Sequence, residues 1–418
     1  MDVSYTKYIE YNMWSYIDNL DEEMEYASFI NFLNSDEFRS FGEGIAYLIK
    51  KKDEAAEITA DNLGKYLKAK CEENGISLSD IGSRNTFKAW FDGSRPDKKA
   101  ANREKLFSLA FALKLDIEEV KYLFHNVYLD RAFDYRNYKE TVYYYCIANG
   151  YDYAHANDII RAIEENNKDS QDGMCTKAIS REIEAVKTDE ELVDWICKRW
   201  NNFQYNNKTA IENFKELFDS AKKLVDREYT MYPESFDKPS SVRENTTTFM
   251  YSVILNCFSE KADSKFNSVF ENKTNINSEI KTNFPSINSL CEIARKVNTG
   301  SSDKNYDELR KNIILLKFYT FFENALLELG NKYGRDNDSE EYRRDMFVYR
   351  EKFIEETNDR LSDCGMCELY VANPYDLLFV VCAYDMNPVD TLRGIIAEIK
   401  YPEENMSLGN SNAEESVL

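Results

Sequence analysis

Apolar residues recur every three or four positions along most of this chain, a spacing that places them on one face of an α-helix. Only 14 Gly and 7 Pro occur in 418 residues, so few positions interrupt a helical pattern. We therefore predict an all-α fold.

The C-terminal half has the most regular pattern. Two long apolar stripes, separated by a polar loop, predict a pair of antiparallel helices: Leu315, Phe318, Phe322, Leu326 and Leu329, then Tyr342, Met346, Tyr349, Phe353 and Leu361. Two further helix starts occur at Asn373-Pro374 and Asn387-Pro388, because Asn caps a helix and Pro suits its first turn. The Asp two residues after each Pro is expected to face the helix dipole.

Polar breaks suggest how the chain divides into domains. We predict an N-terminal helical extension at 1–58, a compact module at 59–130, a middle helical domain at 131–231, a C-terminal helical domain at 242–400 and a disordered tail at 401–418. The large helical body is expected to be a bundle or an irregular helical repeat.

The stretch from Ser83 to Ala110 has the most informative order of residues. In its first helix, Phe87, Trp90 and Phe91 would lie inward, and Arg84, Asn85 and Lys88 would lie on the outer face. Gly93 would end that helix in a left-handed conformation, and Ser94-Arg95-Pro96 would turn the chain toward the next helix.

This stretch resembles the lambda-repressor-like (Cro/XRE-type) helix-turn-helix family over about residues 59–127. The resemblance rests on the order WFDGSRP and then LFSLAFAL, and the second helix, at about 78–82, is shorter than is usual in the family. It implies that the N-terminal part of the recognition helix enters the major groove of DNA. Base-contacting residues would be Arg84, Asn85 and Lys88, and phosphate-contacting residues Ser94, Arg95, Lys98 and Lys99. The segment from Val120 to Ile163 resembles the region C-terminal to the module in some regulators of Gram-positive bacteria.

Charge limits where nucleic acid could bind. The chain has a formal net charge of -22, which opposes general attraction to phosphates. Between Arg84 and Lys105, however, seven Lys/Arg stand against three Asp/Glu. Any DNA contact is therefore expected on a local basic patch. The acidic surplus elsewhere is compatible with solubility, with basic partners or with mimicry of nucleic acid.

No catalytic or cofactor motif is evident. The chain lacks the glycine-rich phosphate and dinucleotide motifs, HExxH and GxSxG. His125 and His155 are interpreted as core or interface residues without an acid-base partner. Cys364 and Cys367 form the one CxxC among nine cysteines, too few ligands for structural zinc. We predict no enzyme activity, no metal and no cofactor, although chemistry by carboxylates alone stays open.

No apolar run of about 18 residues and no secretory leader at Met1 are present, so we expect a cytoplasmic protein without a membrane span. The resemblance favours a sequence-specific DNA-binding transcriptional regulator whose acidic body dimerises or senses a signal, such as a small molecule, a peptide or a protein partner. A homodimer is expected on double-stranded DNA, because one helix-turn-helix contacts half of a typical site. Two alternatives remain: a non-catalytic interaction, inhibitor or accessory protein of a phage-defence or mobile-element system, and an enzyme with an unrecognised site.

Overall fold

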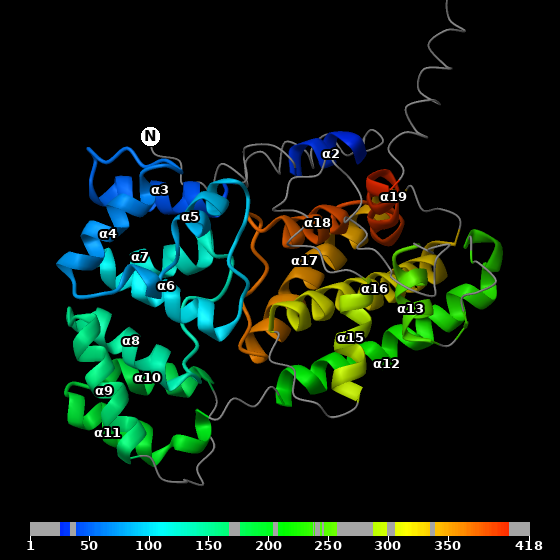
Figure 1. Ribbon diagram of the computed structural model, residues 1–418. Helices are drawn as coiled ribbons and strands as arrows, with labels where there is room; N and C mark the ends of the chain where they lie inside the picture. The colour runs from blue at the N-terminus through cyan, green and yellow to red at the C-terminus, as the bar shows by residue number, and fades with distance from the viewer. Residues whose placement is uncertain are drawn as a thin grey trace, which may run out of the picture. The chain divides into compact units, whose positions relative to one another are not determined.

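The computed structural model describes residues 26–33, 39–166, 176–203, 208–236, 238, 243–244, 246–256, 287–298, 306–334 and 339–400 (Figure 1). All regular elements in these ranges are helices, which confirms the predicted all-α fold. No described helix combines the length and apolar composition that a membrane span requires. The expected tail at 401–418 lies outside the described residues.

The chain forms two compact units: a middle unit of residues 39–207 and an outer unit that combines residues 1–38 with 208–418. The middle unit contains α3 (Phe41–Lys52), α4 (Leu63–Glu73), η2 (Leu78–Asp80), α5 (Arg84–Phe91), α6 (Ala100–Ala112), α7 (Ile117–Tyr122), η3 (Leu123–Val127), α8 (Tyr138–Asn149), α9 (Tyr153–Asn166), α10 (Thr176–Ala185), α11 (Asp189–Lys198) and η4 (Trp200–Asn202). The outer unit contains α2 (Tyr26–Leu33), α12 (Lys208–Met231), η5 (Pro233–Ser235), α13 (Thr247–Ile254), α15 (Ile287–Asn298), α16 (Tyr306–Tyr333), α17 (Glu340–Asp363), α18 (Pro374–Ala383) and α19 (Pro388–Lys400).

This division differs from the predicted domain boundaries. The boundaries predicted at residues 58 and 130 do not divide the middle unit into domains, because one hydrophobic core includes residues from Phe41 to Phe203. The predicted extension at 1–58 is itself divided: α3 packs on α5 in the middle unit, and α2 packs on α19 in the outer unit. Gly394 makes the second contact possible, since a Cβ there would collide with the ring of Tyr26. The boundary predicted at 231 lies instead at 207, because α12 packs along α16.

Helices α16 and α17 form the predicted antiparallel pair in the outer unit (Figure 1). The ring of Tyr333 lies 5.7 Å from that of Tyr342 near the connection, and Phe318 lies 5.5 Å from Phe353 farther along. Helices α18 and α19 begin at Pro374 and Pro388, as the two Asn-Pro pairs predict.

A buried arginine holds the centre of the middle unit together. Arg103 on α6 donates two hydrogen bonds to Glu140, at 2.8 and 2.7 Å, and one to Asp130 at 2.6 Å. Its remaining hydrogen bonds go to the backbone carbonyls of Arg131 and Ala132. We call Arg103, Asp130 and Glu140 the Arg103 cluster. It fixes α6, α8 and the loop between α7 and α8 in one arrangement.

The outer unit contains a similar arrangement around Arg310 on α16. Arg310 donates to both carboxylate oxygens of Asp376, at 2.8 and 2.6 Å, and to the carbonyls of Cys367 and Glu368. Asp376 also accepts the backbone N–H of Tyr370 at 2.9 Å. Asp376 therefore lies in the first turn of α18 as predicted, but its main partner is a buried guanidinium rather than the helix dipole alone.

Glu323 on α16 is a carboxylate whose surroundings in the outer unit shift its pKa. Burial, reinforced by the negative charge of Glu228, raises the pKa of Glu323 to about 7. Glu228 itself is held by Arg393, which donates to its two oxygens at 2.7 and 3.0 Å. A proton on Glu323 therefore relieves both the loss of hydration and the repulsion between the two carboxylates.

We predict that Arg103→Ala lowers the free energy of unfolding of the middle unit by about 3 to 5 kcal/mol, because Glu140 would remain buried without its countercharge. The matched control is Arg161→Ala, whose ion pair with Asp158 is 68 % and 70 % exposed and is expected to contribute less than about 0.5 kcal/mol. Urea unfolding monitored by circular dichroism measures both. Equal effects of the two substitutions would contradict the role of the Arg103 cluster.

We also predict a pH effect from Glu323. The folded-state pKa of Glu323 lies above the ordinary value of 4.5, so the folded state binds its proton more tightly than the unfolded state does. The contribution of Glu323 to the free energy of unfolding is therefore highest below about pH 4.5 and is lost as the pH rises through about 7. Glu323→Gln should match the wild type near pH 4.5 and should be more stable by about 2 kcal/mol at pH 8. Chemical unfolding measures the free energy of unfolding of both proteins. A difference between them that stays constant from about pH 4.5 to about pH 8 would rule out the raised pKa of Glu323.

Candidate nucleic-acid interface

Helix α5 begins with a reciprocal cap. The Ser83 side chain accepts the backbone N–H of Thr86 at 3.3 Å, and the Thr86 hydroxyl accepts that of Ser83 at 3.3 Å. Phe87 and Trp90 are buried, at 1 % and 4 % exposed, while Arg84 and Asn85 are exposed. The predicted faces of this helix are therefore confirmed for these four side chains, whereas Phe91 and Lys88 are half-buried.

Aromatic packing fixes the buried face of α5 against α3. The ring of Trp90 lies 4.8 Å from Phe41 of α3 and 5.1 Å from Phe87, both in edge-to-face contact. The half-buried ring of Phe91 lies directly over Gly42, where a Cβ would come within 2.5 Å of it. Helix α3 can therefore approach α5 closely, and the outer face of α5 is presented on a rigid base.

The turn after α5 forms as predicted. Gly93 has a positive φ of 85°, and the N–H of Ser94 donates to the carbonyl of Ala89 at 2.8 Å. The next loop is held by Tyr128, whose hydroxyl donates to the Asp97 carbonyl at 2.6 Å. This places the start of α6 at a fixed distance from the end of α5.

Arg95 has a different environment from the one expected of a phosphate contact. It is half-buried, donates to the backbone carbonyl of Arg39 at 3.3 Å, and lies 6.0 Å from the ring centre of Phe41. The aromatic surface of α3 attracts the guanidinium plane, so this side chain helps to position the turn.

A groove of about 390 Å³ lies between α5, the turn and α6. It brings together three predicted site residues, Asn85, Ser94 and Arg95, with three polar residues that were not predicted. These are Thr86, Asn102 and Lys105. The helical spacing of Asn102 and Lys105, three positions apart on α6, could have indicated that they share a face.

Arg84 and Lys88 occupy the adjoining side of α5, one turn apart, and are not among the residues that line the groove. Lys88 pairs with Asp61 at 2.8 Å, and Asp61 is 81 % exposed. The pKa of Asp61 is lowered, first by the hydrogen bond that Lys88 donates and by the positive charge of Lys88, and to a smaller extent by the charge of Arg84. The outer face of α5 therefore carries a carboxylate beside its basic residues, a feature absent from the sequence-based prediction.

The basic excess on this surface is smaller than the sequence indicates. Arg103, one of the seven basic residues counted between Arg84 and Lys105, is buried in the Arg103 cluster and does not reach solvent. Lys99 is exposed and pairs with Asp97 in the loop. Lys98, in the same loop, is half-buried. Arg84 and Lys105 are exposed, so their side chains can meet an anion.

Taken together, the site offers side-chain amides, hydroxyls and a few cations on a rigid helix and turn. This chemistry suits hydrogen bonds to base edges and phosphates. Among the described residues, no group of three or more His, Cys, Asp or Glu is arranged to hold a metal ion.

Comparisons with known proteins add no relative. No family model matches the chain, and neither the curated proteins nor the solved structures contain a significant match to it.

Proposed function

We propose that the middle unit binds double-stranded DNA through α5 and the turn after it, and that the protein is a sequence-specific transcriptional regulator. In this proposal, the remaining helices dimerise the protein or sense a partner. The resemblance of the α4–α6 region to the Cro/XRE-type helix-turn-helix supports the proposal.

The observation that carries the proposal is the placement of Arg84 and Asn85. Both side chains are exposed in the first turn of α5, and the opposite face of the same turn is fixed by the buried Phe87. Arg forms bidentate hydrogen bonds with guanine, and Asn with adenine, in the major groove. Helix α5 has eight residues, so it is about 12 Å long and a major groove can accommodate it.

Local charge also supports the proposal. Without Arg103, six basic side chains stand against three acids between Arg84 and Lys105, in a chain with a net charge of -22. With Asp61, which pairs with Lys88, the acids on this surface number four. A duplex would therefore be attracted to this surface and repelled by acidic surface elsewhere, which favours one mode of docking.

A second candidate function is a protein-binding module without DNA affinity. The specific observation in its favour is the Lys88–Asp61 ion pair, which offers one negative charge where a DNA-binding helix needs positive potential. Both functions use the same surface, so they can be separated by the ligand that the surface selects.

The test is selection of bound fragments from a random DNA pool at about 150 mM salt, which suppresses purely electrostatic binding. We compare the wild type with the double variant Arg84→Ala, Asn85→Ala and with Arg161→Ala, a control that removes an exposed arginine elsewhere. The proposal expects one enriched motif with wild type and control, and its loss in the double variant. Absence of enrichment with folded wild-type protein would favour the protein-binding function.

On the selected site, Arg84→Ala should weaken binding by about 1 to 3 kcal/mol and relax the preference at one base position. Lys98→Ala should weaken binding to all sequences alike and reduce the salt slope by about 1. Fluorescence anisotropy with matched and mismatched duplexes measures both quantities. Equal losses that do not depend on sequence would exclude base contact by Arg84.

Asp61→Asn should strengthen DNA binding several-fold at low salt, because it frees Lys88 and removes a negative charge from the interface. Asp194→Asn is the matched control, since Asp194 also pairs with an exposed lysine, Lys198, at 2.5 Å, but lies on α11. The same anisotropy titration compares the two. An unchanged or weaker affinity of Asp61→Asn would show that Lys88 does not face the duplex.

A further inference from the structure

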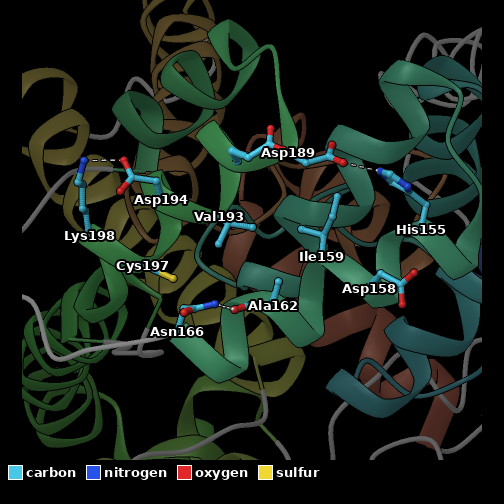
Figure 2. A pocket seen from close by; sticks show the side chains of 11 residues that line it. His155, Asp158, Ile159, Ala162, Asn166, Asp189, Val193, Asp194, Cys197 and Lys198 are labelled. Carbon is cyan, nitrogen blue, oxygen red and sulfur yellow. Dashed lines mark hydrogen bonds and ion pairs between the residues drawn. The ribbon is translucent and has the colours of Figure 1, made fainter.

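A second groove in the middle unit, of about 850 Å³, lies between α9 and α11 (Figure 2). The two helices lie side by side, and they run in the same direction because residues at their starts pair with each other, as do residues at their ends. His155 Nε2 is 2.9 Å from Asp189 Oδ2 near their N-terminal ends, and the Cys197 thiol contacts the Ile163 carbonyl at 3.9 Å near their C-terminal ends. The first of these pairs corrects the expectation that His155 lacks an acidic partner.

The floor of this groove is apolar. Ile159 and Val193 face each other in its middle, as Figure 2 shows, and Ala162 and Cys197 continue the floor toward one end. Val193, Ala162 and Cys197 remain half-buried rather than buried. Covering them with an apolar side chain would therefore remove further apolar surface from water.

The rim of the groove is acidic on both walls. Its charged residues are Asp158 on α9, Asp189, Glu190 and Asp194 on α11, and one basic residue, Lys198. The side chains of Asp158 and Asp194 are 70 % and 59 % exposed, and each pairs with an exposed cation of its own helix, Asp158 with Arg161 and Asp194 with Lys198. Glu190 is exposed on α11. This arrangement is complementary to a ligand with an apolar face between two basic flanks.

The dimensions of the groove fit a short helix. The lining residues on α9 extend from His155 to Asn166, which corresponds to about 16 Å of helix axis or about three turns. Tyr151 lies beyond the His155 end, is 39 % exposed, and its ring is 4.3 Å from that of His155. An exposed tyrosine in this position offers an additional contact surface, as is common at protein interfaces.

We propose that this groove binds an amphipathic α-helix of a partner protein, with apolar residues on one face and Lys or Arg on both flanks of that face. The bound helix lies between α9 and α11, its apolar face covers the half-buried Val193, Ala162 and Cys197, and its basic side chains pair with Asp158 and Glu190. The inference is independent of DNA binding by α5.

The probe is a fluorescent synthetic peptide of about 14 residues with leucines on one helical face and lysines on both flanks. Two comparison peptides replace the lysines with glutamates or the leucines with glutamines. Full-length protein at about 100 mM salt should bind the first peptide at least about tenfold more tightly than either comparison peptide. Absence of binding, or equal binding of the glutamine peptide, overturns the proposal.

The double variant Asp158→Lys, Glu190→Lys should bind the lysine peptide at least about tenfold more weakly than the wild type. The matched control is Glu72→Lys, Glu118→Lys, which makes the same change in net charge at side chains 68 % and 79 % exposed. The control should bind within about twofold of the wild type. Equal losses in the two variants, or no loss in the first, overturn the proposal.

Sedimentation tests the other occupant, a second copy of this chain. The groove variant should have the same oligomeric state as the wild type. A wild-type dimer that the groove variant converts to monomer would assign the groove to self-association and overturn the proposal.

Discussion

The buried pairing of Arg103 with Glu140 is the interaction on which the middle unit depends. It joins α6 to the first turn of α8 and, through Asp130 and two carbonyls, to the loop between α7 and α8. The same turn of α6 presents Asn102 and Lys105 to the groove beside α5. The buried pairing of Arg103 therefore determines the position of α6, which forms one wall of the candidate DNA-binding surface.

The outer unit uses the same arrangement, which indicates that each unit stabilises its own core. Asn137 caps α8 and Asn373 caps α18, and in each helix a carboxylate three residues after the cap accepts hydrogen bonds from the buried arginine. In both, that carboxylate also accepts a backbone N–H from six residues before it, that of Asp134 for Glu140 and of Tyr370 for Asp376. Five hydrogen bonds from Arg103 and four from Arg310 offset the cost of burying each guanidinium.

Local features of the sequence predicted the helices well, because caps, glycine turns and apolar stripes act over a few residues. The inward side chains of Phe87 and Trp90, the turn at Gly93 and the helix start at Pro374 are consequences of such signals. Pairing across the fold could not be predicted in this way. Arg103 lies 37 residues from Glu140, and its local sequence resembles a solvated helix face. The inward position of Arg95, the approach of Asp61 to Lys88 and the groove between α9 and α11 likewise depend on tertiary packing.

The most direct test of the central claim, that α5 reads bases, is methylation interference on the selected duplex, which places a methyl group on guanine N7 in the major groove. Arg contacts guanine through N7 and O6. We expect that methylation at one guanine blocks binding of the wild type and that Arg84→Ala is insensitive to the same methyl group. Identical interference patterns for the two proteins would contradict it.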